Sequence, residues 1–301
     1  MNISIIVTYN PDDKVLDIIN SLLHQNTEII VVDNCSDNSK IINKVLEIQK
    51  DKENINFHKL KKNLGLSKAQ NIGIKYSRER NAEFTFFFDQ DTKIPNNYIE
   101  TMIENWNQID QTDNKIGILG PNYLNPETKE GAKFLILDKN KYKLFKINYG
   151  SNEVNNLISS GLMVKNTVFD SVGLMDESFF IDQIDTDFSI RVNDNGYKIY
   201  VTANTQLEHC IGETSTKKIF GKVFKTNNHS AMRKYFFIRN SFWTIKKNRL
   251  SGPMKVYIAH QIIYTFLTAI LFEKNKGIKL IKMGQGFIDG IRYFSKENQK
   301  Q

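Results

Sequence analysis

Two aspartates, Asp89 and Asp91, stand one residue apart directly after three phenylalanines in the stretch FFFDQDTKIP, residues 86–95. Such an apolar run is typical of a buried strand, so the pair is expected where that strand ends. Carboxylate oxygens this close favour a hard cation, Mg²⁺ or Mn²⁺, that also binds diphosphate oxygens. Without a cation the two charges repel each other. A plain strand-to-loop turn with aspartate as a capping residue is the alternative that the pair alone leaves open.

A second acidic cluster lies in FFIDQIDTDFSIR, with Asp182, Asp185 and Asp187 followed by Arg191. If a helix starts near Asp185, then Asp187 and Arg191 are four residues apart and can pair on its surface. Asp182 and Asp185 would lie at or before the first turn, where the helix dipole favours an ionised carboxylate. An ionised aspartate there can accept a proton from a substrate hydroxyl. The alternative is that these acids only cap the helix.

Two further residues give weaker signals. His209 follows an expected strand and precedes a glycine, but a lone histidine is more often structural than a ligand. Gly65, in KKNLGLSKAQNIG, can open a helix whose first amides and neighbouring lysines attract phosphate. The stretch is neither a Walker loop nor a GxGxxG motif, so the motif alone is a weak indication.

Alternating strands and helices position these residues. Near-continuous apolar strands indicate a parallel sheet covered on both faces, with ligands beyond the carboxyl ends of the strands. Thr8 to Asn10, Asp33, and Asp89 to Asp91 all sit at such ends and are expected to face one crevice. A hairpin-rich insert is expected over 125–155, followed by a strand, a helix, the acidic cluster at a helix start, and a strand leading to His209. The earlier expected strands lie in 3–11, which ends in a loop, in 28–37, where the strand ends on Asp33, and in 54–60, 83–91 and 115–124. The earlier expected helices are 15–25, 41–50, 66–80 and 96–109.

Charge divides the chain. Residues 214–301 hold 18 lysines and arginines against three acids, whereas residues 1–213 hold 23 against 30. We therefore expect a catalytic domain over 1–213 and a basic, aromatic, helical region over 214–301 that meets a polyanion. Cys35 and Cys210 lack CxxC spacing, so neither a disulfide framework nor a thiolate zinc site is supported, and a reducing cytoplasm fits best. The first residues do not read as a signal peptide.

Together these blocks resemble the family 2 glycosyltransferases, which have the GT-A fold, and among them the bacterial rhamnosyltransferases that use dTDP-L-rhamnose. The resemblance is collinear from residue 2 to about residue 240 and implies a Rossmann-like, mostly parallel α/β sheet. Its DQD triplet and the block beginning FID are the parts most like rhamnosyltransferases. The matching blocks are VTYNP, VVDNCS, NLGLSKAQNIGI, FFFDQD, SSGLMV, FFIDQIDTDFSIR, EHCIGE and RKYFFIRN.

The resemblance also implies roles for single residues. Asp185 takes the position of the general base, Asp91 binds the cation, and His209 is a further ligand or diphosphate contact. Asp182, Gly161 and Arg191 are implied to contact the sugar or the acceptor. The implied donor nucleotide contacts are Thr8, Tyr9, Asn10, Asp33, Asn63, Gly65, Ala69, Asn71, Asp89, Arg233 and Arg239. The two arginines are implied to close over the diphosphate.

The implied reaction inverts the anomeric carbon in one displacement, because the acceptor hydroxyl attacks from the face opposite the nucleotide. The implied acceptor is a polyprenyl-diphosphate-linked glycan of a capsule or O-antigen polysaccharide. Two departures from the family pattern bear on the donor: Gln183 replaces the usual aromatic residue, and Asp187-Phe188 replaces Glu-Trp. A UDP-hexose donor, for a glucosyl-, galactosyl- or N-acetylhexosaminyltransferase, is therefore the alternative.

The longest apolar stretch, VYIAHQIIYTFLTAILF over 256–272, has 17 residues, fewer than the ~20 needed to span a bilayer. With lysines before and after it, a helix lying on anionic lipid is expected, and with it a cytoplasmic enzyme held peripherally at the inner face of the membrane. The alternative is a homodimerisation or core-covering helix.

Three other functions fit parts of the sequence. A nucleic-acid-binding protein would explain the basic C-terminal region but not the acidic clusters, so no nucleic-acid partner is expected. A sugar-1-phosphate nucleotidyltransferase would normally carry a glycine-rich basic loop where TYNPDDK stands. A non-catalytic scaffold does not require Asp91 and Asp185.

Overall fold

The protein is described here by a computed structural model, which covers residues 1–125, 130–208, 215–219, 222–226, 228–248 and 250–297. The chain forms two compact units. The first comprises Met1–Ile136, Leu144–Phe180 and Phe188–His209, and the second comprises Leu137–Lys143, Ile181–Asp187 and Cys210–Gln301. The acidic segment 181–187 therefore belongs to the second unit, although it interrupts the sequence of the first.

An eight-stranded sheet forms the centre of the first unit, in the order β3-β2-β1-β4-β9-β5-β10-β8. Six of its strands run parallel, as expected, whereas β9 and β8 run antiparallel to their neighbours. The strands of this sheet are β1 (Asn2–Thr8), β2 (Glu28–Asp33), β3 (Ile55–Lys59), β4 (Phe84–Asp89), β5 (Ile116–Leu124), β8 (Ser151–Val154), β9 (Leu162–Lys165) and β10 (Lys198–Glu208). A separate hairpin pairs β6 (Phe134–Leu137) with β7 (Tyr142–Phe145), in the expected insert.

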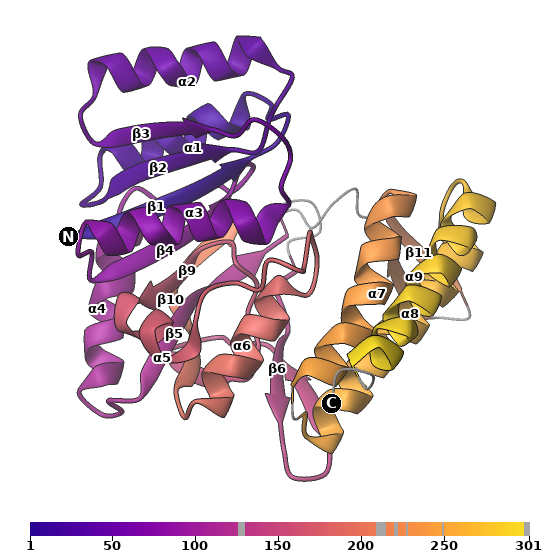
Figure 1. Ribbon diagram of the computed structural model, residues 1–301. Helices are drawn as coiled ribbons and strands as arrows, with labels where there is room; N and C mark the ends of the chain where they lie inside the picture. The colour runs from indigo at the N-terminus through magenta and orange to yellow at the C-terminus, as the bar shows by residue number, and fades with distance from the viewer. Residues whose placement is uncertain (126–129, 209–214, 220–221, 227, 249, 298–301) are drawn as a thin grey trace. The chain divides into compact units, whose positions relative to one another are not determined.

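Helices lie on both sides of this sheet (Figure 1). They are α1 (Lys14–Leu23), α2 (Ser39–Asp51), α3 (Leu66–Glu79), α4 (Tyr98–Asp110), α5 (Asn166–Val172) and α6 (Ile184–Asp194), the last of which begins in the second unit. The three phenylalanines before Asp89 are fully buried, and Phe86 and Phe88 pack edge-on against Tyr98 of α4. Burial of this apolar strand fixes where its carboxyl end emerges.

The register of the sheet brings the expected strand ends together. Thr8 stands opposite Asp33, and Val7 stands opposite Asp89. Because the strands are parallel, all three carboxyl ends lie along one edge of the sheet. The expected position of Thr8, Asp33 and Asp89 at strand ends is confirmed, and a crevice shared by them stays a prediction.

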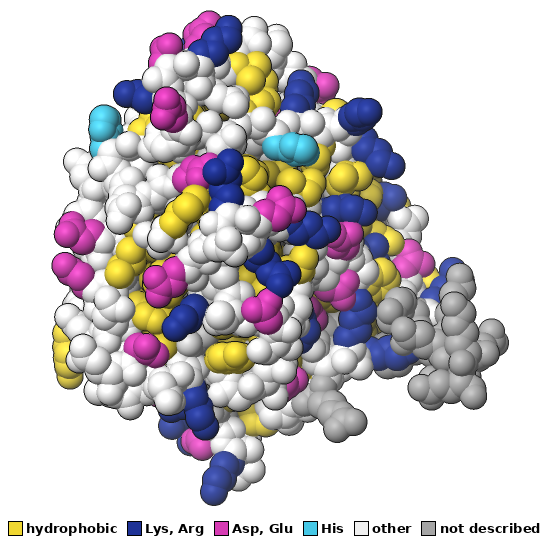
Figure 2. All heavy atoms as spheres, turned by 60° about the vertical axis from the view of Figure 1, so that its left-hand side comes forward, with side chains coloured by type: hydrophobic (Ala, Val, Ile, Leu, Met, Phe, Trp, Pro, Cys, Tyr) yellow, Lys and Arg dark blue, Asp and Glu magenta, His cyan; other side chains and the backbone are white. Residues whose placement is uncertain are grey.

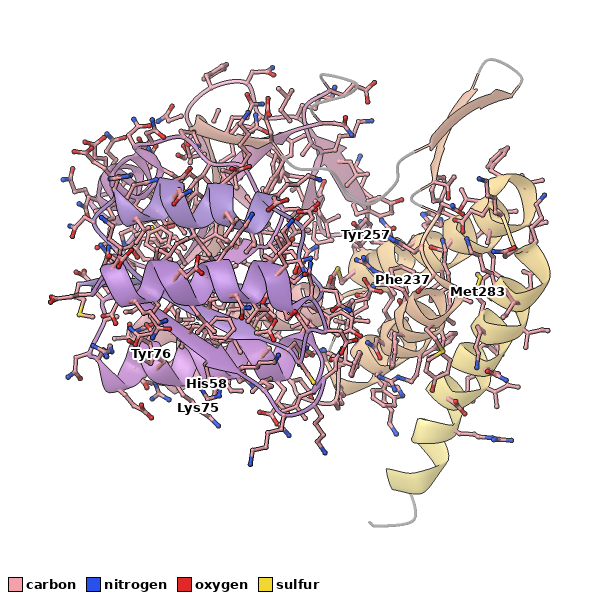
Figure 3. All side chains as sticks on the ribbon, turned by 90° about the horizontal axis from the view of Figure 1, so that it is seen from above. His58, Lys75, Tyr76, Phe237, Tyr257 and Met283 are labelled. Atoms are coloured by element: carbon pink, nitrogen blue, oxygen red, sulfur yellow. The ribbon has the colours of Figure 1, made fainter. Side chains whose placement is uncertain are left out.

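The second unit consists mainly of helices α7 (Ala231–Lys247), α8 (Gly252–Phe272) and α9 (Lys276–Glu297), with a small antiparallel pair, β11 (Ser215–Ile219) and β12 (Lys222–Thr226). The strand pair was not expected from the sequence. The core of the second unit contains Ile238, Ala269 and Met283, against which Phe237 and Phe266 pack. Figure 3 shows Phe237 and Met283 among these helices.

Helix α8 is longer than the apolar stretch suggested. It begins at Gly252 and has 21 residues, so by length and composition alone it could cross a membrane, unlike the other helices in the described parts of the chain. It differs from a core helix because one of its faces is exposed. The large apolar side chains on that face are Val256, Ile263, Tyr264, Leu267, Ile270 and Leu271, each 41–55% exposed.

Candidate functional site

A buried polar network lies where β1 and β2 end. Asp33 is completely buried, and its Oδ1 accepts hydrogen bonds from the hydroxyls of Thr8 and Ser36. Its Oδ2 accepts from the backbone amide of Ser36 at 3.0 Å. Asp33 is thus held in one orientation at the carboxyl end of β2, and its contact with the nucleotide stays a prediction.

The middle residue of the DQD triplet fixes the loop that follows β1. The side-chain oxygen of Gln90 accepts from the Tyr9 amide at 2.8 Å, and its Nε2 donates to the Tyr9 carbonyl at 3.3 Å. Asn10, with a positive φ of 46°, donates its amide to Ser36 and accepts from the Asp37 amide. The Tyr9 side chain is 49% exposed. An aromatic ring presented on a fixed backbone can stack on a nucleobase.

The start of α3 holds another part of the first unit. Gly65 has a φ of +88°, and a Cβ there would lie 2.7 Å from the carbonyl oxygen of Phe180. Asn63 accepts from the Gly65 amide, and the Leu66 amide donates to the Phe180 carbonyl at 2.7 Å. We expected the first amides of this helix to attract phosphate. One of them is occupied by Phe180 instead, so this helix start anchors the chain immediately before the acidic segment.

Two more expected nucleotide contacts on α3 are buried. Ala69 is fully buried. The amide side chain of Asn71 donates to the Met175 carbonyl and accepts from the Met175 amide, both at 2.9 Å. Asn71 therefore fastens the loop after α5 to α3, and its contribution to a nucleotide pocket stays a prediction.

Gly161 and Arg191, expected near the acceptor, also have structural contacts. Gly161 has a φ of +81°, and a Cβ would come within 2.4 Å of Leu207, so only glycine fits. The Arg191 guanidinium donates to the carbonyls of Val172 at 2.7 Å and Leu174 at 3.0 Å. Acceptor binding by either residue stays a prediction.

The expected cation ligands are only partly described. Asp89 is half-buried and Asp91 is exposed, one turn residue beyond it. Lys93 pairs with Glu208, the residue before His209, so the strand that leads to His209 reaches the DQD turn. His209 itself lies outside the described residues. Within those residues, no three side chains of His, Cys, Asp or Glu are grouped as a metal site.

The acidic segment of the second unit has an unusual backbone. Asp182 and Gln183 both have a φ of +64°. The Arg233 guanidinium binds the Asp182 carboxylate, with Nε at 3.1 and 3.3 Å from its two oxygens. Burial raises the pKa of Asp182 above its usual value, although Arg233 and Lys234 oppose the shift. Arg233, expected at the donor diphosphate, is thus paired with an aspartate in this structure.

Helix α6 starts at Ile184, as expected, and places Asp185 in its first turn. The expectation that Asp187 lies on the helix surface was wrong, because Asp187 is buried, with 2% of it exposed. Its Oδ1 accepts from the Asn248 side chain at 3.0 Å. The sequence spacing could not indicate that Asp187 is buried and bonded to Asn248.

Arg239, the other expected diphosphate contact, lies over the Trp243 ring with its guanidinium carbon 4.0 Å from the ring centroid. Its Nε and Nη2 donate to Asn240 Oδ1 at 2.9 and 2.8 Å. Burial lowers the pKa of Arg239, and Tyr235 and Asp289 oppose this. A role at the diphosphate stays a prediction.

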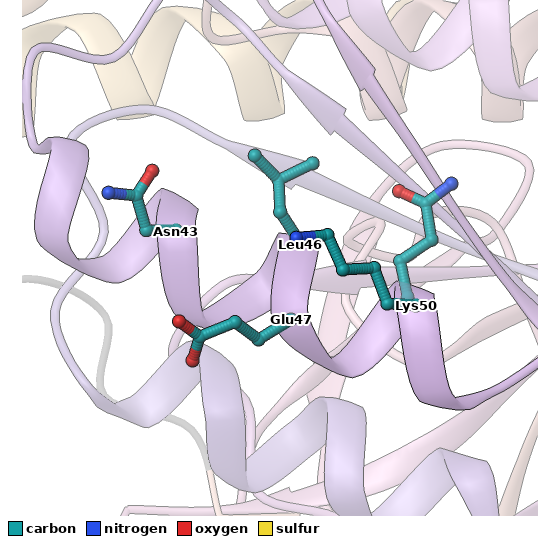
Figure 4. A pocket seen from close by; sticks show the side chains of 5 residues that line it. Asn43, Leu46, Glu47 and Lys50 are labelled. Carbon is teal, nitrogen blue, oxygen red and sulfur yellow. The ribbon is translucent and has the colours of Figure 1, made fainter.

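Sequence reasoning missed Ser36 and Gln90, whose side chains hold the loop that follows β1. The signal that could have found Gln90 was its place between two assigned aspartates. A surface hollow lies elsewhere, along α2, lined by Asn43, Leu46, Glu47, Gln49 and Lys50 (Figure 4). It contains none of the expected site residues. On the face shown in Figure 2, acidic and basic side chains are interspersed rather than gathered into one patch.

Comparisons with known proteins agree with this geometry. The family model described as Glycosyl transferase family 2 matches residues 4–172. The chain is 34% identical over 294 residues to a dTDP-rhamnosyl transferase, RfbF, of Shigella flexneri, covering 96% of this chain and 95% of that protein.

Solved structures show the fold. TarS 1-349 of S. aureus in complex with UDP-GlcNAc matches with a TM-score of 0.58 at 18% identity, covering 96% of this chain and 81% of that one. GalNAc-T7 with UDP, GalNAc and Mn²⁺ matches with a TM-score of 0.57 at 13% identity, covering 88% and 54%. The first unit therefore has the GT-A arrangement of a mixed sheet between helices.

Proposed function

The chain belongs to family 2 of the glycosyltransferases, and from this premise we propose that it transfers L-rhamnose from dTDP-L-rhamnose to a hydroxyl of a bacterial cell-surface glycan. One observation carries the choice of donor: the 34% identity to a dTDP-rhamnosyl transferase extends over nearly the whole of both chains. The fold alone would not choose a sugar, because one fold supports many donors.

In this proposal Asp185 is the general base. Its carboxylate takes the proton of the acceptor hydroxyl, and the hydroxyl oxygen forms a bond to the anomeric carbon. The bond from that carbon to the diphosphate breaks, and dTDP leaves with the electron pair. Because the attack comes from the opposite face, a β-linked donor yields an α-rhamnoside.

The donor nucleotide is assigned to the sheet edge formed by the ends of β1, β2 and β4. Exposed Tyr9 and Asn10 would contact the base and ribose, with the Tyr9 ring as a stacking surface, and buried Asp33 would hold this loop beside the nucleotide through Ser36. Gln90 keeps the Tyr9 backbone in place. These groups bind and orient the donor but do not move protons.

The two carboxylates of the DQD turn are of the ligand type that suits a divalent ion, but they are too few to complete its coordination. Asp89 and Asp91 offer the oxygen ligands that Mg²⁺ and Mn²⁺ prefer. His209, which lies outside the described residues, and diphosphate oxygens of the donor would complete the coordination. A bound ion would neutralise charge on the departing diphosphate.

A UDP-hexose donor remains the second candidate, because Gln183 stands where the related rhamnosyltransferases carry an aromatic residue. A donor panel separates the two. Purified protein is offered dTDP-L-rhamnose, UDP-glucose, UDP-galactose and UDP-N-acetylglucosamine, each with Mg²⁺, Mn²⁺ or EDTA, and nucleotide release is measured. Selective turnover of dTDP-L-rhamnose supports the proposal, and selective turnover of a UDP-sugar replaces its donor. No turnover and no shift in melting temperature with any donor would refute the enzyme assignment.

We further propose that the region 214–301 holds the enzyme on the inner face of the membrane, near a polyprenyl-diphosphate-linked acceptor. The exposed apolar face of α8 has no charged residue between Lys255 and Glu273, and exposed Lys255, Lys274 and Lys276 stand at its ends. Apolar burial combined with attraction to anionic headgroups is the usual basis of such binding. A second copy of the chain is less favoured as the occupant, because both copies would bring the same positive charges to the contact.

Flotation with liposomes tests this part. The protein should float with anionic vesicles and less with zwitterionic ones. Ile263→Asp with Leu267→Asp should abolish flotation, because it places two charges on the face that would enter the lipid. Both side chains are about half exposed, so the new charges do not enter the protein core. Lys274→Gln with Lys276→Gln should weaken only the anionic preference. A wild-type chain that stays unbound, and is dimeric by sedimentation, would assign the face to a homodimer instead.

A further inference from the structure

The turn before α6 is held in a conformation that its residues do not favour. Asp182 and Gln183 are consecutive residues with a φ of +64° each. Residues other than glycine rarely have a backbone in this left-handed region, and such strain persists only where surrounding groups enforce it. Two strained residues directly before the helix that carries Asp185 suggest that the turn serves the reaction.

Helix α7 provides the enforcing groups. The Asn240 side chain is completely buried, and its Nδ2 donates to the carbonyls of Ile181 at 2.8 Å and Asp182 at 3.0 Å. Arg239 donates two hydrogen bonds to the oxygen of the same amide. The amide can therefore not rotate without losing both sets of bonds. One turn position further, the Gln183 side chain donates to Ser241 at 3.2 Å.

These contacts act on the backbone that sets the direction of α6. Asp185 follows the turn by two residues and lies in the first turn of the helix. We propose that Asn240 is a positioning residue: oriented by Arg239, it holds the strained turn that aims Asp185 at the acceptor hydroxyl. The inference rests on the proposed role of Asp185 as the base. It gives Arg239, stacked on Trp243, a function that does not require contact with the donor.

Kinetics of Asn240 variants test the inference. Asn240→Ala removes both donors to the turn, and Asn240→Asp replaces them with an oxygen that faces two carbonyls. We expect kcat for transfer to fall on the order of tenfold in the first variant and further in the second, because most molecules would leave the strained conformation. The Kd for dTDP, measured by calorimetry, should stay within twofold of wild type.

The matched control is Asn248→Ala, which removes an amide directly after the same helix; that amide bonds the Asp187 side chain rather than the strained backbone. Its kcat should stay within twofold. Because loss of buried Asn240 can also reduce stability, Asn240→Ala is combined with Gln183→Gly. Glycine adopts a positive φ without a Cβ cost, so the double variant should recover much of the lost kcat. A purely structural role for Asn240 predicts no such recovery.

Several results would overturn the inference. They are unchanged kcat in both Asn240 variants, a parallel loss of dTDP affinity, or no recovery by glycine at position 183. If Asn240→Ala does not fold, Arg239→Lys provides the same test, since it retains the charge but loses the paired hydrogen bonds to Asn240. Transfer at the wild-type rate by Asp185→Asn would instead refute the base assignment, which separates that failure from this one.

Discussion

Replacing Glu273 should destabilise the second unit severely. Glu273 stands between α8 and α9 with its side chain fully buried, and it pairs with Lys234 of α7 at 2.7 Å and Lys279 of α9 at 2.8 Å. The two lysine side chains are only 7% and 6% exposed. Thr226 also donates to this carboxylate. One acid thus compensates two buried bases that tie all three helices together.

The expected magnitude follows from this burial. Glu273→Gln keeps the shape but leaves both ammonium groups in the interior without an anion. Breaking a buried pair from one side costs about 3–5 kcal/mol, because the remaining charge is uncompensated. For a unit of this size such a loss lowers Tm on the order of 20 °C. Urea unfolding followed by circular dichroism measures the change, with exposed Asp138→Asn as the control that should leave the unfolding free energy unaltered.

Acidification and a rescue variant sharpen this test. Burial alone would raise the pKa of Glu273, but hydrogen bonds from Lys234, Lys279 and Thr226 outweigh it and lower that pKa below 4.5. The stability from the carboxylate is therefore fully present above about pH 4.5 and is lost as pH falls through the lowered pKa. The difference between wild type and Glu273→Gln should shrink in that acidic range. Replacing Lys234, Glu273 and Lys279 together by Met, Leu and Met should restore most of the stability. A triple variant with a lower free energy of unfolding than Glu273→Gln would refute the reasoning.

Three further outcomes are expected. Gly161→Ala should lower the unfolding free energy by about 2–5 kcal/mol in urea titrations, because it combines a left-handed backbone with overlap against Leu207; a loss below 0.5 kcal/mol would contradict the packing described. Gln90→Ala should weaken dTDP binding about 3- to 10-fold in calorimetry by releasing the Tyr9 backbone, and equal affinity would show that the hydrogen bonds from Gln90 to Tyr9 are not needed for dTDP binding. The His229 imidazole should titrate near pH 4 by NMR, because burial and nearby Arg233 and Lys234 lower its pKa to about 4, and it should cost stability as pH falls below 6.5; titration near 6.5 would indicate an exposed ring.

The order of strands and helices in the first unit was predictable from sequence. Each apolar run is bounded by turn residues, and its apolar residues either are nearly continuous, as in a buried strand, or recur at helical spacing. The direction of β9 was not. Leu162 to Lys165 read like any buried strand, and its antiparallel pairing with β4 and β5 depends on tertiary contacts. The pair β11–β12 was missed for a related reason, since basic residues mark no particular secondary structure.

The sequence indicated which residue types stand at the strand ends but not the contacts that they make. The sequence indicated that Asp33 and Asp89 end parallel strands, and the register places these two strands on either side of β1 with the same direction. It could not indicate that Gly65 is needed for the approach of Phe180, because those residues are more than a hundred positions apart. Nor could it assign Asn240 to the turn at Asp182, since only the folded second unit brings α7 against that segment.

Transfer by Asp185→Asn, with dTDP binding measured on the same sample, tests the central claim most directly. Asparagine has nearly the same shape but cannot take the acceptor proton. If Asp185 is the base, transfer from dTDP-L-rhamnose should fall by about 10²–10⁴-fold while the Kd for dTDP stays within twofold of wild type. Transfer within threefold of the wild-type rate would contradict the assignment.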